Sequence, residues 1–215
     1  MTGKRKINKP GKKNKTVNIN FICSGNTCRS YIAEAIASHL LKTIYNKRKP
    51  DLKDRVNIGS AGTDISITAI PVNTFRALDI FEIPNIKFKP TPIDELIVEK
   101  SDLLITMATS HKLNVISKFK RIDRRKILNL LELSNIILYI ETEDIYKRVI
   151  TSKLSSSSND FIQKIQIIKE IGSESIIKPE IIDIEDPFGS SIDKYVEVSK
   201  LLKENIIIIF DYLFR

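Results

Sequence analysis

The sequence predicts a single α/β domain with a central four-stranded parallel sheet flanked by helices. The 215-residue length suits one domain, and short runs typical of strands alternate with apolar positions at helical spacing. Because helical patterns separate the strand-like runs, we expect parallel strands joined by right-handed crossovers. The predicted strands lie near residues 17–23, 55–60, 102–107 and 126–129.

A basic segment precedes the first predicted strand. It carries much of the formal net charge of +9, and the remainder of the chain is near neutral. Since the segment lacks apolar residues to bury, we expect residues 1–16 to form a disordered tail and residues 17–215 to form the domain. The tail is expected to make only weak, screened contacts with nucleic acid or an anionic surface. Its basic residues are Lys4, Arg5, Lys6, Lys9, Lys12, Lys13 and Lys15.

The first strand-like run leads into a loop suited to bind a phosphoryl group. Residues 17–22 read as a buried strand, and apolar positions recur at helical spacing after Ser30. The first amides of a helix lack intrahelical partners and point, with the helix dipole, toward a bound anion. Gly25 permits close approach of the backbone and Asn26 tolerates a left-handed turn, so successive N–H groups are expected to converge on the anion.

Cys23 and Arg29 have the spacing of a nucleophile and a phosphate clamp. The field at the helix start is expected to hold Cys23 as a thiolate, the reactive form of cysteine. Arg29 is expected at the mouth of the loop, where its planar guanidinium can hold two phosphoryl oxygens into the transition state. The Ser30 hydroxyl can donate to the Cys23 sulfur. The alternative is a buried cysteine beside an ordinary helix start.

This loop resembles the signature of the low-molecular-weight protein-tyrosine phosphatase family, which is Cys, five residues, Arg and Ser between the first strand and the first helix. Residues 59–63 resemble the family's segment after its second strand, and residues 186–191 resemble its general-acid loop. Residues 17–132 and 183–215 align with the family in order. The resemblance implies substrate-binding roles for Ser24, Gly25, Asn26, Thr27, Cys28, Ser30 and Phe188, and a structural role for Ser60, which is otherwise a turn residue.

Two positions resemble the bacterial protein arginine phosphatase branch. Thr27 stands where typical tyrosine phosphatases carry Ile, and Phe188 stands where they commonly carry Tyr after Asp-Pro. A hydroxyl at position 27 can bond a phosphoguanidinium or position water, whereas Ile packs against a flat aromatic leaving group. We therefore expect hydrolysis of phosphoarginine on proteins, with an opposing protein arginine kinase in the same cell. The alternative is phosphotyrosine hydrolysis, with Thr27 a neutral polar residue.

Asp186 is the predicted general acid and base. Its carboxyl can deliver a proton as the P–N or P–O bond breaks, and its carboxylate can then take a proton from the water that attacks the phosphocysteine. This mechanism requires no metal or cofactor. Asp183 and Glu185 are expected to form a solvated acidic edge. His39 and His111 are expected to be packing or surface residues outside the reaction.

Two functions other than hydrolysis remain open: a phosphocysteine carrier of sugar-transport type and an inactive phosphate-binding module. Arg29 and Asp186 argue against the carrier, since a carrier must protect its phosphoryl group from water. The two cysteines of the chain are Cys23 and Cys28, and the resemblance implies a reversible disulfide between them on oxidation, whereas Cys28 is otherwise a small packing residue. Cysteine usage suits a reducing interior and no secretory signal or membrane span is visible, so we expect a cytoplasmic protein.

Two further helical segments are predicted in the C-terminal part. Residues 133–182 have no counterpart in the compact family pattern and carry helix-like positions around a Ser-rich break at 155–158. We expect a helical insertion that covers the active site, docks substrate proteins or is peripheral. Beyond it, Ser190 and Asp193 predict a capping box that starts a long helix. The apolar face of that helix is predicted to contain Ile192, Val196, Ser199, Leu202, Ile206, Ile209 and Leu213.

Overall fold

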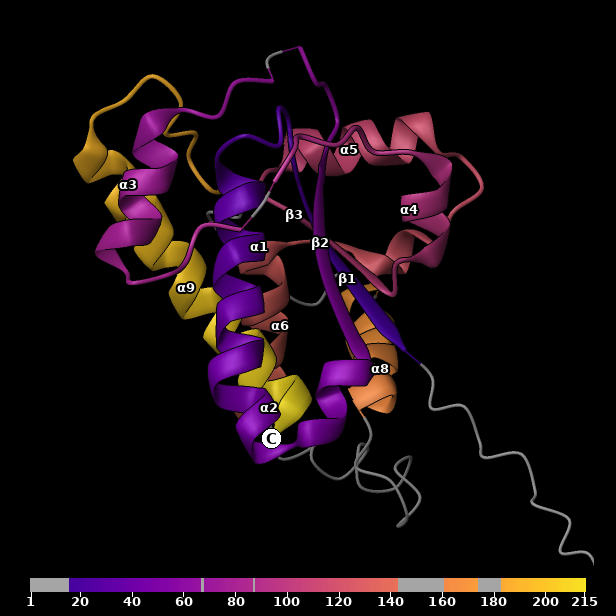
Figure 1. Ribbon diagram of the computed structural model, residues 1–215. Coiled ribbons are helices and arrows are strands. Elements are labelled where there is room, and N and C mark those ends of the chain that lie inside the picture. Colours follow the sequence, from indigo (N-terminus) through magenta and orange to yellow (C-terminus); the bar gives the residue numbers. More distant parts are fainter. Residues whose placement is uncertain (1–15, 67, 87, 143–160, 174–182) are drawn as a thin grey trace, which may run out of the picture.

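The structure, a computed structural model, contains a sheet of four parallel strands, as the sequence predicts (Figure 1). It describes residues 16–66, 68–86, 88–142, 161–173 and 183–215. The strand order is β2-β1-β3-β4, so the chain places β2 on one side of β1 and then crosses to the other side for β3 and β4. The strands are β1 (Val17–Cys23), β2 (Val56–Gly62), β3 (Leu103–Thr106) and β4 (Ile127–Asn129).

The strand register brings the carboxyl ends of all four described strands to one edge of the sheet. In the strand register, Cys23 pairs with Gly62 of β2, and Ile22 pairs with Thr106 of β3. Thr106 in turn pairs with Asn129, the last residue of β4. In open α/β sheets, ligands bind at this edge where the strand order reverses. The loop that follows β1 starts at that position.

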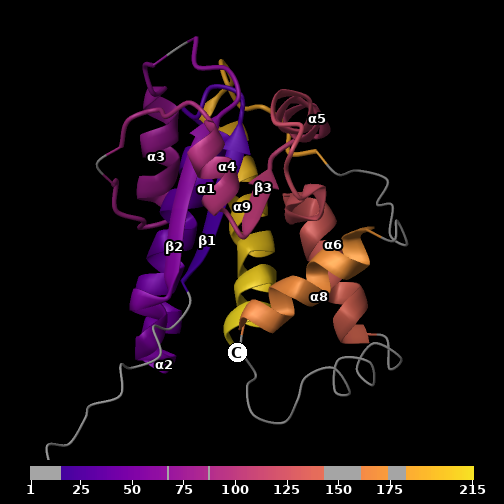
Figure 2. The same cartoon turned by 90° about the vertical axis from the view of Figure 1, so that its right-hand side faces the viewer.

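Among the described residues, five helices lie on one face of the sheet, where α1 and α6 contact the strands and α9 is at the centre of the layer. Alternate residues of β1, among them Ile19 and Phe21, point into the large hydrophobic core that these helices share. Helix α9 contacts α1, α3, α6 and α8, and Figures 1 and 2 show α9 running beside α1. The helices are α1 (Arg29–Leu40), α3 (Val72–Ile80), α6 (Leu130–Thr142), α8 (Phe161–Ser173) and α9 (Ile192–Phe214).

Shorter segments complete the fold on the other face and at the end of α1. Helices α4 (Glu95–Lys100) and α5 (Thr109–Lys118) cover a smaller core that contains Ile22 and Leu104. The chain after α1 continues through a π-helical turn and two short helical turns before it enters β2. These turns are η1 (Leu41–Tyr45), α2 (Asn46–Arg48) and η2 (Pro50–Asp54), and a further turn, η3 (Arg124–Lys126), precedes β4.

The last helix has the predicted apolar face but not the predicted start. Leu202, Ile206 and Ile209 are buried, which confirms the centre of that face. The predicted capping box at Ser190 is wrong, because the N-cap residue is Ser191 and its side chain makes no capping hydrogen bond. Tyr195 is also buried, one position away from the predicted Val196, so the buried stripe is wider than a single row of apolar positions.

Part of the predicted insertion at 133–182 forms two of these helices. It begins inside α6 and contains α8, which packs on α6 and α9. Figures 1 and 2 show α8 beside the C-terminal end of α9, at the opposite end of the sheet from the start of α1. This part therefore does not cover the loop after β1. Residues 1–15, 143–160 (with the Ser-rich break) and 174–182 lie outside the described residues, so the tail and the flap stay predictions.

Candidate active site

The loop between β1 and α1 forms the floor of a pocket of about 160 Å³. Asn26 adopts the left-handed conformation, with φ at 55°, which turns the loop back toward the start of the helix. Most of the predicted site residues line the pocket, whereas Asn26, Ser30 and Ser60 are not among its lining residues. The lining residues are Cys23, Ser24, Gly25, Thr27, Cys28, Arg29, Asp64, Ser66, Asp186 and Phe188.

Cys23 ends β1 with its sulfur beside two hydrogen-bonding groups. The Ser30 hydroxyl oxygen lies 3.0 Å from the sulfur, and the backbone N–H of Asn26 donates to it at 3.3 Å. Ser30 is in the first turn of α1, where the positive end of the helix dipole also favours an anion. The Cys23 sulfur therefore lies among hydrogen-bonding groups at the start of a helix.

A chain of hydrogen bonds orients the Ser30 hydroxyl from below the pocket. The Asn26 amide nitrogen donates to Ser30 and to Ser60, both at 2.8 Å, and its oxygen accepts from the N–H of Thr91 at 2.9 Å. Ser60 in turn donates to the Glu34 carboxylate at 2.6 Å. Because Asn26 donates to both serines, each serine keeps its own proton for another acceptor: Ser60 donates to Glu34, and the Cys23 sulfur is within reach of Ser30. Burial raises the pKa of Glu34.

The loop after β2 is held close against the loop between β1 and α1 (residues 24–28), called the phosphate-binding loop below. The N–H of Thr63 donates to the Cys23 carbonyl at 2.9 Å, and the N–H of Asp64 donates to the Ser24 carbonyl at 3.1 Å. Gly62 makes this approach feasible, because a Cβ at that position would collide with the Ser24 carbonyl oxygen and the Ile65 side chain. Gly62 of the 59–63 motif is thus required by close packing beside the site.

Arg29 connects the first helix to the segment that carries Asp186. Its side chain is 7% exposed, and it donates to the Asp186 carboxylate and, at 3.0 Å, to the Ile184 carbonyl. Its Nε is buried and has no hydrogen-bond partner among the residues that the structure describes. This nitrogen and the adjacent Nη2 form the side of the guanidinium fork that suits two oxygens of a phosphoryl group.

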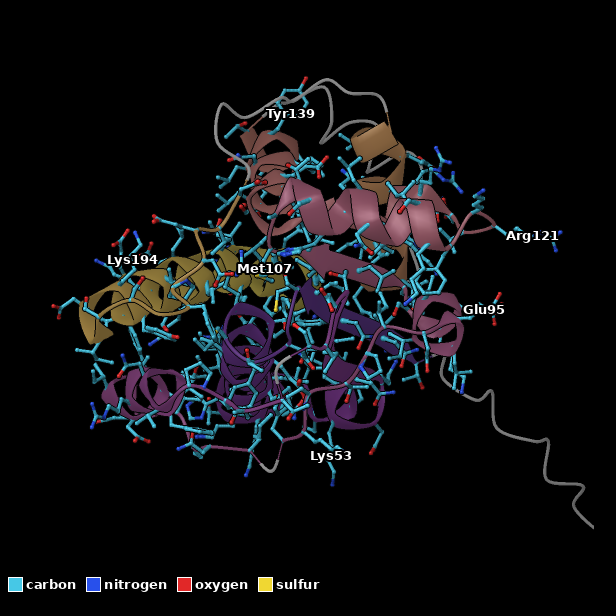
Figure 3. The ribbon with its side chains drawn as sticks, turned by 90° about the horizontal axis from the view of Figure 1, so that it is seen from above. Lys53, Glu95, Met107, Arg121, Tyr139 and Lys194 are labelled. Atoms are coloured by element: carbon cyan, nitrogen blue, oxygen red, sulfur yellow. The ribbon has the colours of Figure 1, made fainter. Side chains whose placement is uncertain are left out.

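Asp186 lies at the pocket mouth in a segment anchored on both sides. Its carboxylate is about half exposed and accepts from the N–H of Phe188 at 3.1 Å. On the preceding side, the N–H of Ile184 donates to the Met107 carbonyl at 2.7 Å. Viewed from above, Met107 lies near the centre of the molecule and Lys194, which pairs with Glu185 at 2.6 Å, lies near the periphery (Figure 3).

Asp183 is exposed, as predicted for a solvated acidic edge, but its carboxylate also binds a neighbouring segment. The Asp183 carboxylate accepts from the backbone N–H and the hydroxyl of Thr109, both at 2.7 Å, at the start of α5. It also accepts from the Asn129 amide at 3.4 Å. Asp183 therefore ties the Asp186 segment to α5 and β4, and Glu185 is exposed as well. The sequence shows no local signal for this contact, because its partners are distant in the chain.

His111 contacts the site in a way that the sequence did not predict, and Asp64 and Ser66 are lining residues of the pocket that it also did not predict. His111 is 3% exposed, and its Nε2 lies 2.9 Å from the Ser24 hydroxyl oxygen. Burial, with a further contribution from the nearby Arg29 charge, lowers the pKa of His111 to about 4. The imidazole is therefore neutral at physiological pH and supports the wall of the phosphate-binding loop. His39 is not among the residues that line the pocket.

We expect His111 to make folding stability depend on pH between about 4 and 6.5. In this range an unfolded His binds a proton that the folded protein excludes, so the contribution is complete above pH 6.5 and is lost as pH falls toward about 4. Relative to His111→Gln, wild type should lose up to about 3 kcal/mol of unfolding free energy from pH 7 to pH 4. Urea unfolding at several pH values measures the difference, and a pH-independent difference would contradict this assignment.

Cys28 lies on the side of the loop that faces α9. Its sulfur is 3.6 Å from the Tyr195 hydroxyl and 3.8 Å from the Thr27 hydroxyl. Burial raises the pKa of the Cys28 thiol, so Cys28 is protonated at neutral pH. Both cysteines are free thiols here, and the reversible disulfide stays a prediction.

Searches for a metal site and for a membrane span give no candidate in the described ranges. Across them, no group of three or more His, Cys, Asp or Glu side chains is placed to hold a metal ion. No helix in the same ranges is long and apolar enough to cross a membrane.

Comparisons with known proteins identify the family of this fold. The family model described as low molecular weight phosphotyrosine protein phosphatase matches residues 18–145. A curated relative, the protein-arginine-phosphatase of Bacillus subtilis (strain 168), is 33% identical over 118 residues, which are 54% of this chain and 71% of the relative.

Solved structures agree with the family match. A YwlE arginine phosphatase, a Cys-to-Ser mutant with a phosphorylated active-site serine, has a TM-score of 0.58 at 25% identity, over 91% of this chain and 94% of that chain. A low molecular weight phosphotyrosine phosphatase from Vibrio cholerae has a TM-score of 0.63 at 14% identity, over 91% and 95% of the two chains. The chain belongs to the low molecular weight phosphotyrosine protein phosphatase family and is a cysteine-dependent protein phosphatase.

Proposed function

We propose that this phosphatase hydrolyses phosphoarginine on proteins through a phosphocysteine intermediate. The observation that carries the preference for arginine is the place of Thr27 in the pocket wall. Its backbone carbonyl accepts a hydrogen bond from the Thr74 hydroxyl of α3 at 3.2 Å, and this bond helps to fix the position of Thr27 in the pocket wall. A hydroxyl there can hydrogen-bond a phosphoguanidinium, whereas a phosphotyrosine ring gains most from apolar walls. The curated protein-arginine-phosphatase relative supports the same preference.

In the proposed first step, the phosphoryl group is transferred to Cys23. The thiolate attacks phosphorus, a P–S bond forms and the P–N bond to arginine breaks. Asp186 gives its proton to the departing guanidine nitrogen, and Arg29 holds the equatorial oxygens as their charge changes. The loop amides and the α1 start bind the same oxygens. The YwlE mutant with a phosphorylated active-site serine supports this step, since its phosphoryl group is attached to an active-site side chain.

In the proposed second step, water releases inorganic phosphate. The Asp186 carboxylate accepts a proton from water, the water oxygen attacks phosphorus and the P–S bond breaks. Ser30 donates to the departing Cys23 sulfur, which leaves as a thiolate, at the 3.0 Å separation seen here. One carboxylate thus acts as acid and then as base, and the free enzyme is regenerated.

We expect Thr27→Ile to shift the preference toward phosphotyrosine by about tenfold or more in the ratio of kcat/KM values. Ile removes the hydroxyl and adds apolar surface at the wall of the leaving-group site. The measurement compares one protein substrate in its phosphoarginine and phosphotyrosine forms, with Cys23→Ser as the inactive blank. Thr27→Val is the matched control, because it removes the hydroxyl at nearly constant size. An unchanged ratio in both variants would show that Thr27 does not select the substrate.

Phosphotyrosine hydrolysis is the second candidate, and the exposure of the Phe188 ring favours it, although the residue type at this position resembles the arginine branch. The ring lines the pocket and is half exposed, so it is free to stack on an aromatic leaving group. Faster wild-type turnover of the phosphotyrosine substrate would establish this alternative. Faster phosphoarginine turnover would establish the arginine preference, and an opposing protein arginine kinase is then the expected partner enzyme.

A further inference from the structure

The loop after β2 places a carboxylate at the mouth of the phosphate pocket. Asp64 lines the pocket together with Asp186 but comes from a different element. Its backbone is held in place by the hydrogen bond from its N–H to the Ser24 carbonyl and by the preceding bond from Thr63 to Cys23. The side chain is exposed, and it extends from a backbone that the phosphate-binding loop itself positions.

Asp64 differs from Asp186 in having no partner for its charge among the residues that the structure describes. Asp186 accepts from Arg29 and from the N–H of Phe188. The Asp64 carboxylate has no hydrogen bond or ion pair with any side chain in the described segments. It is therefore available to a ligand in the pocket without first breaking a contact within the protein.

An unpaired carboxylate beside an anion site is unfavourable for a substrate that brings only negative charge. A phosphoryl dianion bound over Cys23 and Arg29 is repelled by Asp64, with little to offset the repulsion when the leaving group is a neutral phenol ring. Phosphoarginine is different, because its guanidinium carries positive charge on the nitrogens next to the phosphoryl group. Those nitrogens can donate to a carboxylate with the two-pronged geometry typical of arginine.

We propose that Asp64 is a specificity-determining residue that accepts hydrogen bonds from the guanidinium of the phosphoarginine substrate. The proposal rests on the function proposed above and adds a second selector to Thr27. The two residues act differently. Thr27 offers a hydroxyl from the wall of the phosphate-binding loop, whereas Asp64 interacts with the positive charge of the leaving group. Because the guanidinium is already charged in the bound ground state, the contribution of Asp64 appears mainly in KM.

The test compares Asp64→Asn with wild type on capped single residues of phosphoarginine and of phosphotyrosine, so that no neighbouring basic residue takes part. We expect kcat/KM on phosphoarginine to fall about tenfold, mostly through KM, since hydrogen bonds to charged groups have this magnitude. On phosphotyrosine, kcat/KM should stay within about threefold or rise, because repulsion is removed. Asp64→Glu, which restores the charge, should recover part of the loss.

A charge-matched control separates a local contact from a general change in net charge. Glu95→Gln removes one negative charge on α4, and Glu95 lies at the periphery of the molecule (Figure 3). It should leave both substrates unchanged. Equal losses on both substrates in Asp64→Asn, or no loss on phosphoarginine, would overturn the role of Asp64 while leaving the proposed function intact. Failure of wild type to hydrolyse phosphoarginine would overturn both.

Discussion

Arg29→Lys should lower kcat/KM by about a thousandfold or more on every phosphorylated substrate. Arginine residues that stabilise a transferring phosphoryl group contribute rate factors of about 10³ to 10⁵. Lysine keeps the positive charge but presents one nitrogen, so it cannot hold two oxygens with fixed geometry. In this site it can reach either the Ile184 carbonyl or the Asp186 carboxylate, whereas Arg29 donates to both and keeps Nε for the substrate.

The control for Arg29→Lys is the same exchange at an exposed position. Arg76 lies on α3 with its side chain in solvent, so Arg76→Lys should retain wild-type activity and stability. The melting temperature of each variant shows whether the fold is kept. A loss below tenfold for a folded Arg29→Lys would mean that positive charge is sufficient and that the guanidinium geometry is not used.

The elements that the sequence predicts correctly are those with a local cause. The strand β1, the loop after it and the start of α1 follow from a short apolar run, a turn at Gly25 and Asn26, and helical spacing beyond Ser30. The predicted limits of β1 match the observed limits, whereas those of the other three described strands differ at one or both ends by one or two residues, because strand ends depend on pairing with neighbours. The segment with Asp186 is likewise predicted by its own short motif.

The supports of the site could not be predicted because they depend on contacts across the sheet. Ser24 and His111 are separated by 87 positions in the chain, and Asp183 and Thr109 are separated by 74. The strand order brings these segments together at one edge, and no local pattern in the sequence contains that order. Asp64 was overlooked for a similar reason, since its position follows from how closely Gly62 lets its loop approach Ser24.

Asp186→Asn should slow both proposed chemical steps and make the phosphocysteine observable. General acid and base catalysis each contribute factors of about 10² to 10⁴. On phosphoarginine the first step should fall most, because the departing nitrogen needs a proton. An aryl phosphate with a weakly basic leaving group needs less help in that step, so the second step should become limiting and the intermediate should accumulate.

The expected signature is a burst of phenol followed by slow turnover, with Cys23 carrying one phosphoryl group by intact mass. Asn keeps the size of Asp but has a single accepting oxygen, so it can keep the hydrogen bond from Arg29 or the one from the N–H of Phe188 and loses the other, because the two bonds end on different oxygens of Asp186. Glu185→Gln removes the neighbouring exposed carboxylate and should show neither burst nor loss. If the activity of Asp186→Asn stayed within about threefold of wild type, groups other than Asp186 would have to transfer the protons. Trapped phosphocysteine would exclude a module that only binds phosphate, and its slow hydrolysis relative to wild type would distinguish this enzyme from a carrier that protects the same bond.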